Sequence, residues 1–105
     1  MLSTRVTWLA TVLALAQAPA PAFADTIQIV IEKMAFLPAI VQAKAGDTIE
    51  WINKDKFAHT ATVKGGWEVM LPVGKSGTMT IAKAGSIDYF CRFHPNMTGH
   101  IDVVP

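Results

Sequence analysis

Short runs of residues in which apolar side chains stand at every second position recur along this chain of 105 residues, and they constrain its fold more than any other feature. Ile27, Ile29 and Ile31 have this spacing, and it returns in 48–53 and 86–91. A period of two is typical of a β-strand with one face in a core. Glycine-containing turns separate the runs, and no longer window shows helical spacing. The pattern predicts an all-β sandwich or small barrel of about seven to eight short strands.

The individual runs predict where these strands lie. We expect strands at 27–31, 40–43, 48–53, 59–63, 78–82, 86–91 and 99–104. Residues 67–76 contain Pro72 and Gly74 and show no period, so a loop is expected there. By the parity of the last strand, Ile101 and Val103 face the core and His100 faces outward, which makes His100 a surface residue.

The first 24 residues have the composition of a signal peptide. Arg5 precedes an apolar stretch at 8–16 that is too short to span a bilayer, and Ala22-Phe23-Ala24 has the small-x-small form of a cleavage site. We therefore expect residues 1–24 to be removed and residues 25–105, beginning at Asp25, to form one domain in the periplasm. A retained N-terminal anchor is the alternative.

Removal of this segment leaves 81 residues with eight basic and eight acidic side chains, so the formal net charge is zero. A nucleic-acid binder would need a basic excess. Small exported domains often depend on disulfides, but a single cysteine cannot form an internal one. A bound metal is the other common source of stability for so small a core.

The only cysteine lies in the segment Cys91-Arg92-Phe93-His94-Pro95-Asn96-Met97, where a histidine and a methionine follow it at three-residue steps. Thiolate and thioether are soft ligands and imidazole is borderline, so the set suits copper and does not suit Mg²⁺ or Ca²⁺. A type 1 copper site needs a second imidazole, which completes a trigonal His₂Cys set with a weak axial Met. His59 can supply it.

Each of these residues has an ordinary structural explanation when it is taken alone, since a buried Cys or Met is most often a core residue. Their joint placement favours a metal site instead. Cys91 is expected to end one strand, so that His94 and Met97 lie on the loop that follows, which Pro95 stiffens. His59 begins another strand and can reach the same end of the sandwich. The candidate metal ligands are therefore His59, Cys91, His94 and Met97.

This order of residues, together with the segments AGDTIEWIN and AGSIDYF, resembles the cupredoxins, the small blue copper proteins. Two residues separate Cys from His and two separate His from Met, a short loop most similar to that of the amicyanins; the step to Met is longer in plastocyanins and pseudoazurins. The resemblance covers about residues 40–104. It implies a Greek-key cupredoxin fold and one type 1 copper ion, Cu(I)/Cu(II), held by His59, Cys91, His94 and Met97.

Two departures from the amicyanin pattern accompany the resemblance. Amicyanins have an additional N-terminal segment that pairs as an extra strand, and this chain lacks it. The residue after the first ligand histidine is commonly Asn in the family and is Thr60 here. We expect the backbone N–H of Thr60 to donate to the sulfur of Cys91, and we expect the side-chain lock between the ligand loops to be weakened.

The resemblance and the ligand chemistry predict a periplasmic one-electron carrier and no enzyme. No open coordination position is evident and no nearby carboxylate is placed as a general base, while the multicopper enzymes need more histidines than the three present. The alternative with the same ligands is a periplasmic copper-binding or delivery protein, although the chain has no Met-rich run. A metal-free β-sandwich interaction module is the third interpretation.

Electrons are expected to pass through His94 because its neighbours are apolar. The partners would be transient redox proteins, such as a c-type cytochrome or a dehydrogenase, and the carrier a monomer that binds neither nucleic acid nor, after cleavage, a membrane. We expect an apolar docking patch around His94 and a weakly basic rim. The patch comprises Phe93 and Pro95 together with residues in loops that the resemblance places at the same end, namely Phe57, Met70, Leu71 and Pro72. Met70 and Leu71 would otherwise be ordinary core residues. The rim comprises Lys54, Lys56 and Arg92.

Overall fold

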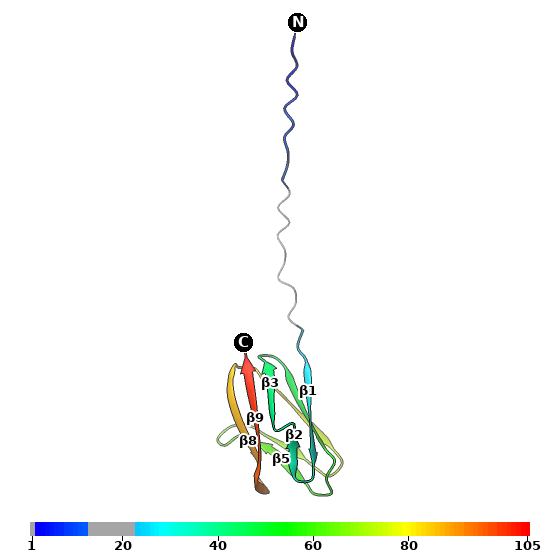
Figure 1. The fold of residues 1–105 in the computed structure, drawn as a ribbon, viewed down its shortest axis with the longest axis vertical. Coiled ribbons are helices and arrows are strands. Elements are labelled where there is room, and N and C mark those ends of the chain that lie inside the picture. The colour runs from blue at the N-terminus through cyan, green and yellow to red at the C-terminus, as the bar shows by residue number, and fades with distance from the viewer. Residues whose placement is uncertain (1, 13–22) are drawn as a thin grey trace.

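The computed structural model describes residues 2–12 and 23–105, and all its regular elements lie in the second range (Figure 1). The strands are β1 (Thr26–Glu32), β2 (Ala35–Leu37), β3 (Ile40–Lys44), β4 (Thr48–Asn53), β5 (His59–Thr62), β6 (Glu68–Leu71), β7 (Ser76–Thr80), β8 (Gly85–Cys91) and β9 (His94–Val104). Within the described residues, no helix is present that would be long and apolar enough to cross a membrane.

The strands form two mixed sheets packed face to face. One sheet has the order β2-β1-β4-β7 and the other the order β3-β9-β8-β5-β6. Most neighbours are antiparallel, but β1 pairs in parallel with β4, and β3 pairs in parallel with β9. Both parallel pairs join strands that are distant in the sequence, as the crossovers of a sandwich require. This architecture confirms the predicted all-β sandwich.

The core is built from the residues that the period of two placed inward. Ile29, Ile31 and Ile49 are completely buried, and Trp51 and Tyr89 pack edge to face between the sheets with ring centroids 5.5 Å apart. Such aromatic pairs add specific contacts to the burial of a large apolar area. The expected inward orientation of these residues is therefore confirmed.

The structure corrects two expectations about strand boundaries. Residues 68–71 form β6, although we expected a loop there: Val69 and Leu71 face the core and Met70 faces outward, and the antiparallel ladder with β5 satisfies the backbone. A run of only four residues before Pro72 is too short to show its period clearly. The last strand begins at His94 and not at residue 99, because Cys91 and His94 already pair across the turn.

The sandwich has two ends, and they carry different features (Figure 1). The β8–β9 turn, which connects Cys91 to His94, lies at the same end as the turn between β1 and β2, and we call this the ligand end. At the other end, the far end, the chain enters β1, β3 turns into β4, and β9 finishes. The two ends are separated by the length of the strands, which run from one end to the other.

Candidate metal centre

Three potential metal ligands converge at the ligand end. One nitrogen or sulfur atom from each of His59, Cys91 and His94 lies within 4.8 Å of the others. The sulfur of Cys91 is 3.7 Å from Nδ1 of His59 and 3.5 Å from Nδ1 of His94. Met97, the fourth predicted ligand, is buried, and it lines a small cavity together with His94.

The strands explain how residues so far apart in sequence meet. His59 is the first residue of β5 and Cys91 the last residue of β8, and these two strands are neighbours in one sheet. Both side chains are completely buried. His94 begins β9 directly after the turn and is only partly buried. The site is therefore enclosed on the side of His59 and reaches the surface at His94.

The donor set fits copper. One thiol and two imidazoles are ligands of the kind that Cu(I) and Cu(II) share, and a thioether in the position of Met97 would add a weak axial donor. Both histidines turn the same nitrogen, Nδ1, toward the sulfur of Cys91. A metal placed among these atoms would meet lone pairs that the fold has already brought together, with little reorganisation.

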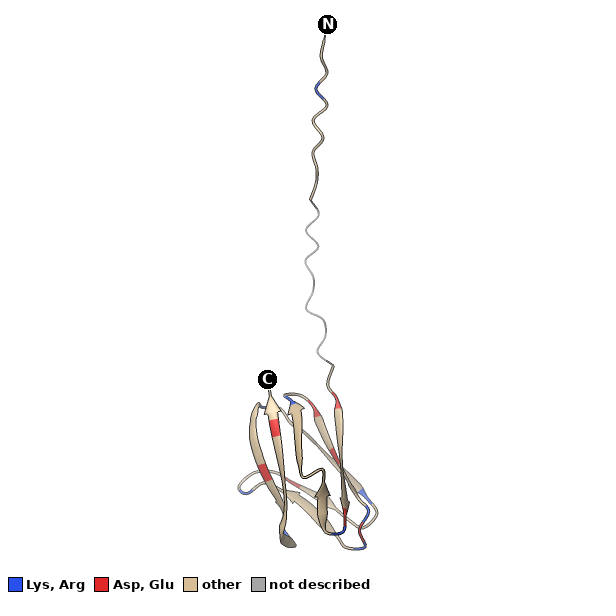
Figure 2. Ribbon diagram, in the orientation of Figure 1, with Lys and Arg blue, Asp and Glu red and all other residues tan. Residues whose placement is uncertain are grey.

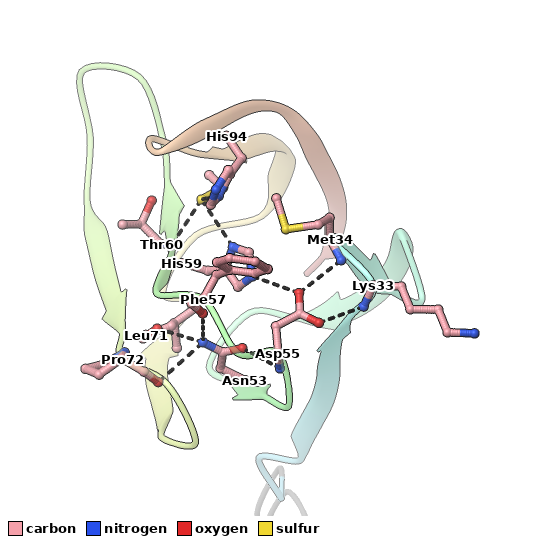
Figure 3. A network of polar contacts seen from close by, with 11 residues as sticks. Lys33, Met34, Asn53, Asp55, Phe57, His59, Thr60, Leu71, Pro72 and His94 are labelled. Atoms are coloured by element: carbon pink, nitrogen blue, oxygen red, sulfur yellow. Dashed lines mark hydrogen bonds and ion pairs between the residues drawn. The ribbon is translucent and has the colours of Figure 1, made fainter.

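Asp55 holds His59 from the side opposite the sulfur (Figure 3). Its Oδ2 lies 2.8 Å from Nε2 of His59, so Nε2 carries the proton and donates it to the carboxylate. Nδ1 is then unprotonated, and its lone pair is available to a metal. The carboxylate also accepts the backbone N–H groups of Lys33, at 2.7 Å, and Met34, at 2.9 Å. Partial burial opposes ionisation of Asp55, but the hydrogen bonds from Met34, His59 and Lys33 outweigh it and lower the pKa of the carboxyl.

Asp55 is a carboxylate close to the cluster that the sequence analysis did not single out. It contacts the nitrogen of His59 that faces away from Cys91 and so orients the ring of this candidate ligand. Sequence reasoning missed it. The available signal was its position four residues before a candidate ligand histidine, since such histidines usually donate their second N–H to a carboxylate or carbonyl.

Thr60 ties the two ligand-bearing segments together. Its backbone N–H lies 3.4 Å from the sulfur of Cys91, which confirms the expected hydrogen bond. Its hydroxyl accepts the backbone N–H of Arg92 at 2.8 Å. A side-chain link between the two segments is therefore present, because the threonine hydroxyl accepts a hydrogen bond from the backbone of the β8–β9 turn.

The side chain of Asn53 forms a second set of hydrogen bonds that holds the segment leading to His59. The side-chain amide of Asn53 donates to the carbonyl oxygens of Phe57 and Leu71, at 2.8 and 3.0 Å, and its Oδ1 accepts the N–H of Asp55 (Figure 3). Asn53 is buried, so these bonds are costly to lose. They fix the loop from β4 to β5 and thereby place both Asp55 and His59.

The partly exposed His94 has apolar neighbours, as expected. The ring of Phe57 approaches it edge on, with centroids 6.4 Å apart, and Phe57 is 60% exposed. Met70 is 49% exposed, and Phe93 and Pro95 are exposed as well. Pro72, also expected in the patch, is exposed too, and we call Phe57, Met70, Pro72, Phe93 and Pro95 the apolar patch. The expected inclusion of Leu71 is wrong, because its parity in β6 turns it completely into the core.

The predicted basic rim is exposed but does not carry three free charges. Lys54, Lys56 and Arg92 are all exposed. However, Arg92 forms an ion pair with Glu68 at 2.7 Å and stacks over the ring of Phe93 at 4.8 Å. In Figure 2, acidic residues lie mainly on the strands of the domain and basic residues mainly in the turns between them. The ion pair of Arg92 therefore connects the β8–β9 turn to β6.

His100 lies on the outer face of the second sheet, away from the cluster of His59, Cys91 and His94. Its two ring nitrogens are 2.6 Å from Asp88 Oδ1 and 2.8 Å from Asp102 Oδ1. Both nitrogens face carboxylates, which favour the protonated form of the ring. The hydrogen bond with Asp88 and then that with Asp102 raise the pKa of His100.

Comparison with known proteins gives the same family by three routes. Residues 5–103 match the cupredoxin-like domain family. Amicyanin of Paracoccus versutus is 36% identical over 87 residues, which are 76% of this chain and 66% of that protein. Amicyanin-alpha of Methylorubrum extorquens is 30% identical and covers 76% of this chain and 73% of its own length. The chain thus spans about two thirds of the length of these curated relatives.

Solved structures agree. A reduced amicyanin variant superposes with a TM-score of 0.69 at 30% identity, covering 74% of this chain and 81% of that one. The Cu(I) form of another amicyanin variant gives 0.69 at 28% identity, covering 80% and 87%. With the sandwich and the convergent His, Cys and His side chains, these likenesses show that the chain belongs to the cupredoxin-like family and is similar to amicyanins.

Proposed function

We propose that this protein is a one-electron carrier that holds a single type 1 copper ion through His59, Cys91, His94 and Met97. The observation that carries the proposal is the convergence of one thiol and two imidazole nitrogens within 4.8 Å at one end of a rigid sandwich. Copper held there would alternate between Cu(I) and Cu(II) and so accept and release one electron. The likeness to amicyanins supports the same function.

The surroundings of the ligands suit fast electron transfer. Asp55 fixes the orientation of His59, and Thr60 donates to the sulfur of Cys91 and holds the turn behind it. Ligands fixed in this way change position little between two oxidation states, which keeps the reorganisation small. The hydrogen bond to the sulfur draws charge from the thiolate and is one of the features that set the reduction potential.

Electrons would enter and leave through His94, and redox partners would dock on the apolar patch. The patch is small, which suits brief encounters with a c-type cytochrome or a dehydrogenase. The carrier would act as a monomer, because a face that exchanges partners must be free. Lys54 and Lys56 border this face as the remaining exposed cations of the predicted rim and would steer an acidic partner.

We further propose that residues 1–24 direct export to the periplasm and that residues 25–105 are the copper domain. Every strand of the described residues lies within Thr26–Val104, and Phe23 and Ala24 are exposed. Part of the leader, including Ala22, lies outside the described residues. The intact mass of the protein purified from the periplasm tests the cleavage position.

Optical and EPR spectra of the copper-loaded protein test the copper proposal. We expect an intense blue colour and the narrow hyperfine splitting of a type 1 centre, both lost in Cys91→Ser because they arise from the copper–thiolate bond. Lys83→Ala, in an exposed turn at the far end, is the matched control and should be blue. A colourless protein that takes up only Zn²⁺ would exclude an electron carrier.

A second measurement separates electron transfer from copper delivery. The complete burial of His59 and Cys91 favours a metal that stays in place. We therefore expect slow loss of Cu(I) to a chelator and rapid oxidation of the reduced protein by a c-type cytochrome. Phe57→Ala should slow that oxidation and leave the spectrum unchanged. Rapid surrender of Cu(I) with slow electron transfer would support delivery instead.

A further inference from the structure

At the far end of the sandwich, the backbone nitrogen of Asp25 lies against a buried carboxylate. It donates to Oδ1 of Asp47 at 2.9 Å. The other oxygen, Oδ2, accepts the backbone N–H of Lys44 at 2.7 Å. Asp47 is only 2% exposed, and it lies in the turn between β3 and β4, directly before the first residue of β4. Hydrogen bonds from the backbone of Lys44 and then of Asp25 lower the pKa of Asp47, which is therefore ionised.

Among the residues that the structure describes, no cationic side chain forms an ion pair or a hydrogen bond with Asp47, and the charge of Lys44 lowers its pKa less than the backbone hydrogen bonds do. The ammonium of Lys44 is turned to the exposed carboxylate of Asp25, 3.1 Å away. A buried carboxylate is normally paired with a cation, because removal from water favours its neutral form. In the unprocessed chain, the two hydrogen bonds described to the carboxylate of Asp47 both come from neutral backbone N–H groups.

The nitrogen that touches Asp47 belongs to the first residue after the predicted cleavage site. Hydrolysis of the Ala24–Asp25 bond by a leader peptidase adds one water: the carbonyl carbon of Ala24 becomes a carboxylate, and the nitrogen of Asp25 becomes an amine that takes up a proton. We propose that this new α-ammonium forms a partly buried ion pair with the carboxylate of Asp47, so that processing itself completes the far end of the fold. The proposal rests on the cleavage position proposed above.

The location gives this pair a structural effect. The carbonyl oxygen of Asp25 accepts the N–H of Thr48, which starts the parallel ladder between β1 and β4, and the backbone of Asp47 pairs with Ile81. An ion pair between Asp25 and Asp47 therefore joins the start of β1 to the β3–β4 turn. The charged groups that face the new ammonium are the carboxylates of Asp47 and of Asp25 itself and the ammonium of Lys44.

A comparison of two chains, both beginning at Asp25 and loaded with copper, tests the pair; one has a free and the other an acetylated N-terminus. Both contain all nine strands. We expect acetylation to lower Tm by roughly 4–8 °C in the native sequence and to have little effect in Asp47→Asn. Lys44→Ala, which removes only the exposed pair with Asp25, should leave the effect of acetylation intact.

The pH dependence provides a second readout if Asp47→Asn does not fold. A carboxylate contact raises the pKa of an α-amino group above its usual range of about 7.7–8.0. The advantage of the free N-terminus should therefore be complete below about pH 7.7 and disappear as the pH rises through the folded-state value. The acetylated chain should lack this dependence.

An equal loss from acetylation in the native sequence and in Asp47→Asn, or no loss in either, would overturn the ion pair. A periplasmic protein whose mass shows cleavage elsewhere than before Asp25 would overturn its formation by processing. Neither outcome touches the copper proposal, because the pair and the ligands lie at opposite ends of the sandwich (Figure 1). The blue spectrum of each chain reports on that proposal separately.

Discussion

His59 donates its Nε2–H to the carboxylate of Asp55 at 2.8 Å while its Nδ1 faces the sulfur of Cys91. The same carboxylate receives two backbone N–H groups from the β1–β2 turn, so it connects that turn to the ligand (Figure 3). The orientation of this buried candidate ligand is thus set by a carboxylate on the side of the ring that faces away from Cys91. The connection joins the first sheet, which holds β1 and β2, to the second, which holds β5.

Asp55→Ala should weaken copper binding by about 10–100-fold, because it frees the ring of His59 and leaves its N–H without an acceptor. The change should appear in competitive titration of Cu(I) against a chelator. Glu32→Gln, an exposed substitution in β1, is the control and should bind copper as the native protein does. Native affinity in Asp55→Ala would contradict a positioning role for this carboxylate.

Thr60→Val should destabilise the protein by about 1–3 kcal/mol, because it leaves the partly buried N–H of Arg92 without its acceptor. Thr60→Ser keeps the hydroxyl and should retain most of the stability. Denaturant unfolding of both variants without copper measures the difference. Equal stability of the two variants would show that the hydroxyl contributes nothing to holding the ligand turn.

Met97→Leu should keep the fold and the blue colour and raise the reduction potential. Leucine fills a similar volume, and the loss of a weak axial donor destabilises Cu(II) more than Cu(I). Redox titration followed by absorbance measures the shift. Met79→Leu, a half-buried substitution in β7, is the matched control. An unchanged potential in Met97→Leu would argue against Met97 as a ligand.

Gly99→Ala should destabilise the sandwich by about 1–3 kcal/mol or more, because a methyl group at residue 99 would overlap the ring of Tyr89. Tyr89 is buried beside Trp51 and cannot move aside without disturbing the core. Thermal unfolding measures the loss. The control is Thr98→Ala, an exposed substitution at the preceding position, and its Tm should change little.

His100 should make stability fall as the pH rises. Its pKa is raised in the folded state by Asp88 and Asp102, so its contribution is complete below the unfolded value of about 6.5 and is lost as the pH rises through the folded value. His100→Asn should lack this dependence. Tm measured across the neutral range for both proteins checks the prediction, and parallel profiles would contradict it.

The sequence carried most of the fold because a period of two is a local property. Alternation at Ile29, Ile31 and Ile49 placed these residues inward, and the structure buries each of them. Where a run was short the period failed, as in β6, whose strand character comes from pairing with β5. Because β6 was not predicted as a strand, the burial of the Leu71 side chain in the core was not predicted either.

The sequence by itself determined the family, the all-β class and the candidate ligands. These features depend on residues that are close in the sequence, such as alternating apolar residues and the spacing of Cys91 and His94. Tertiary structure decided the rest. Asp55 meets His59, Thr60 meets Arg92, and the nitrogen of Asp25 meets Asp47 through hydrogen bonds between separate segments. Such contacts depend on the register and packing of two sheets, which no local pattern encodes.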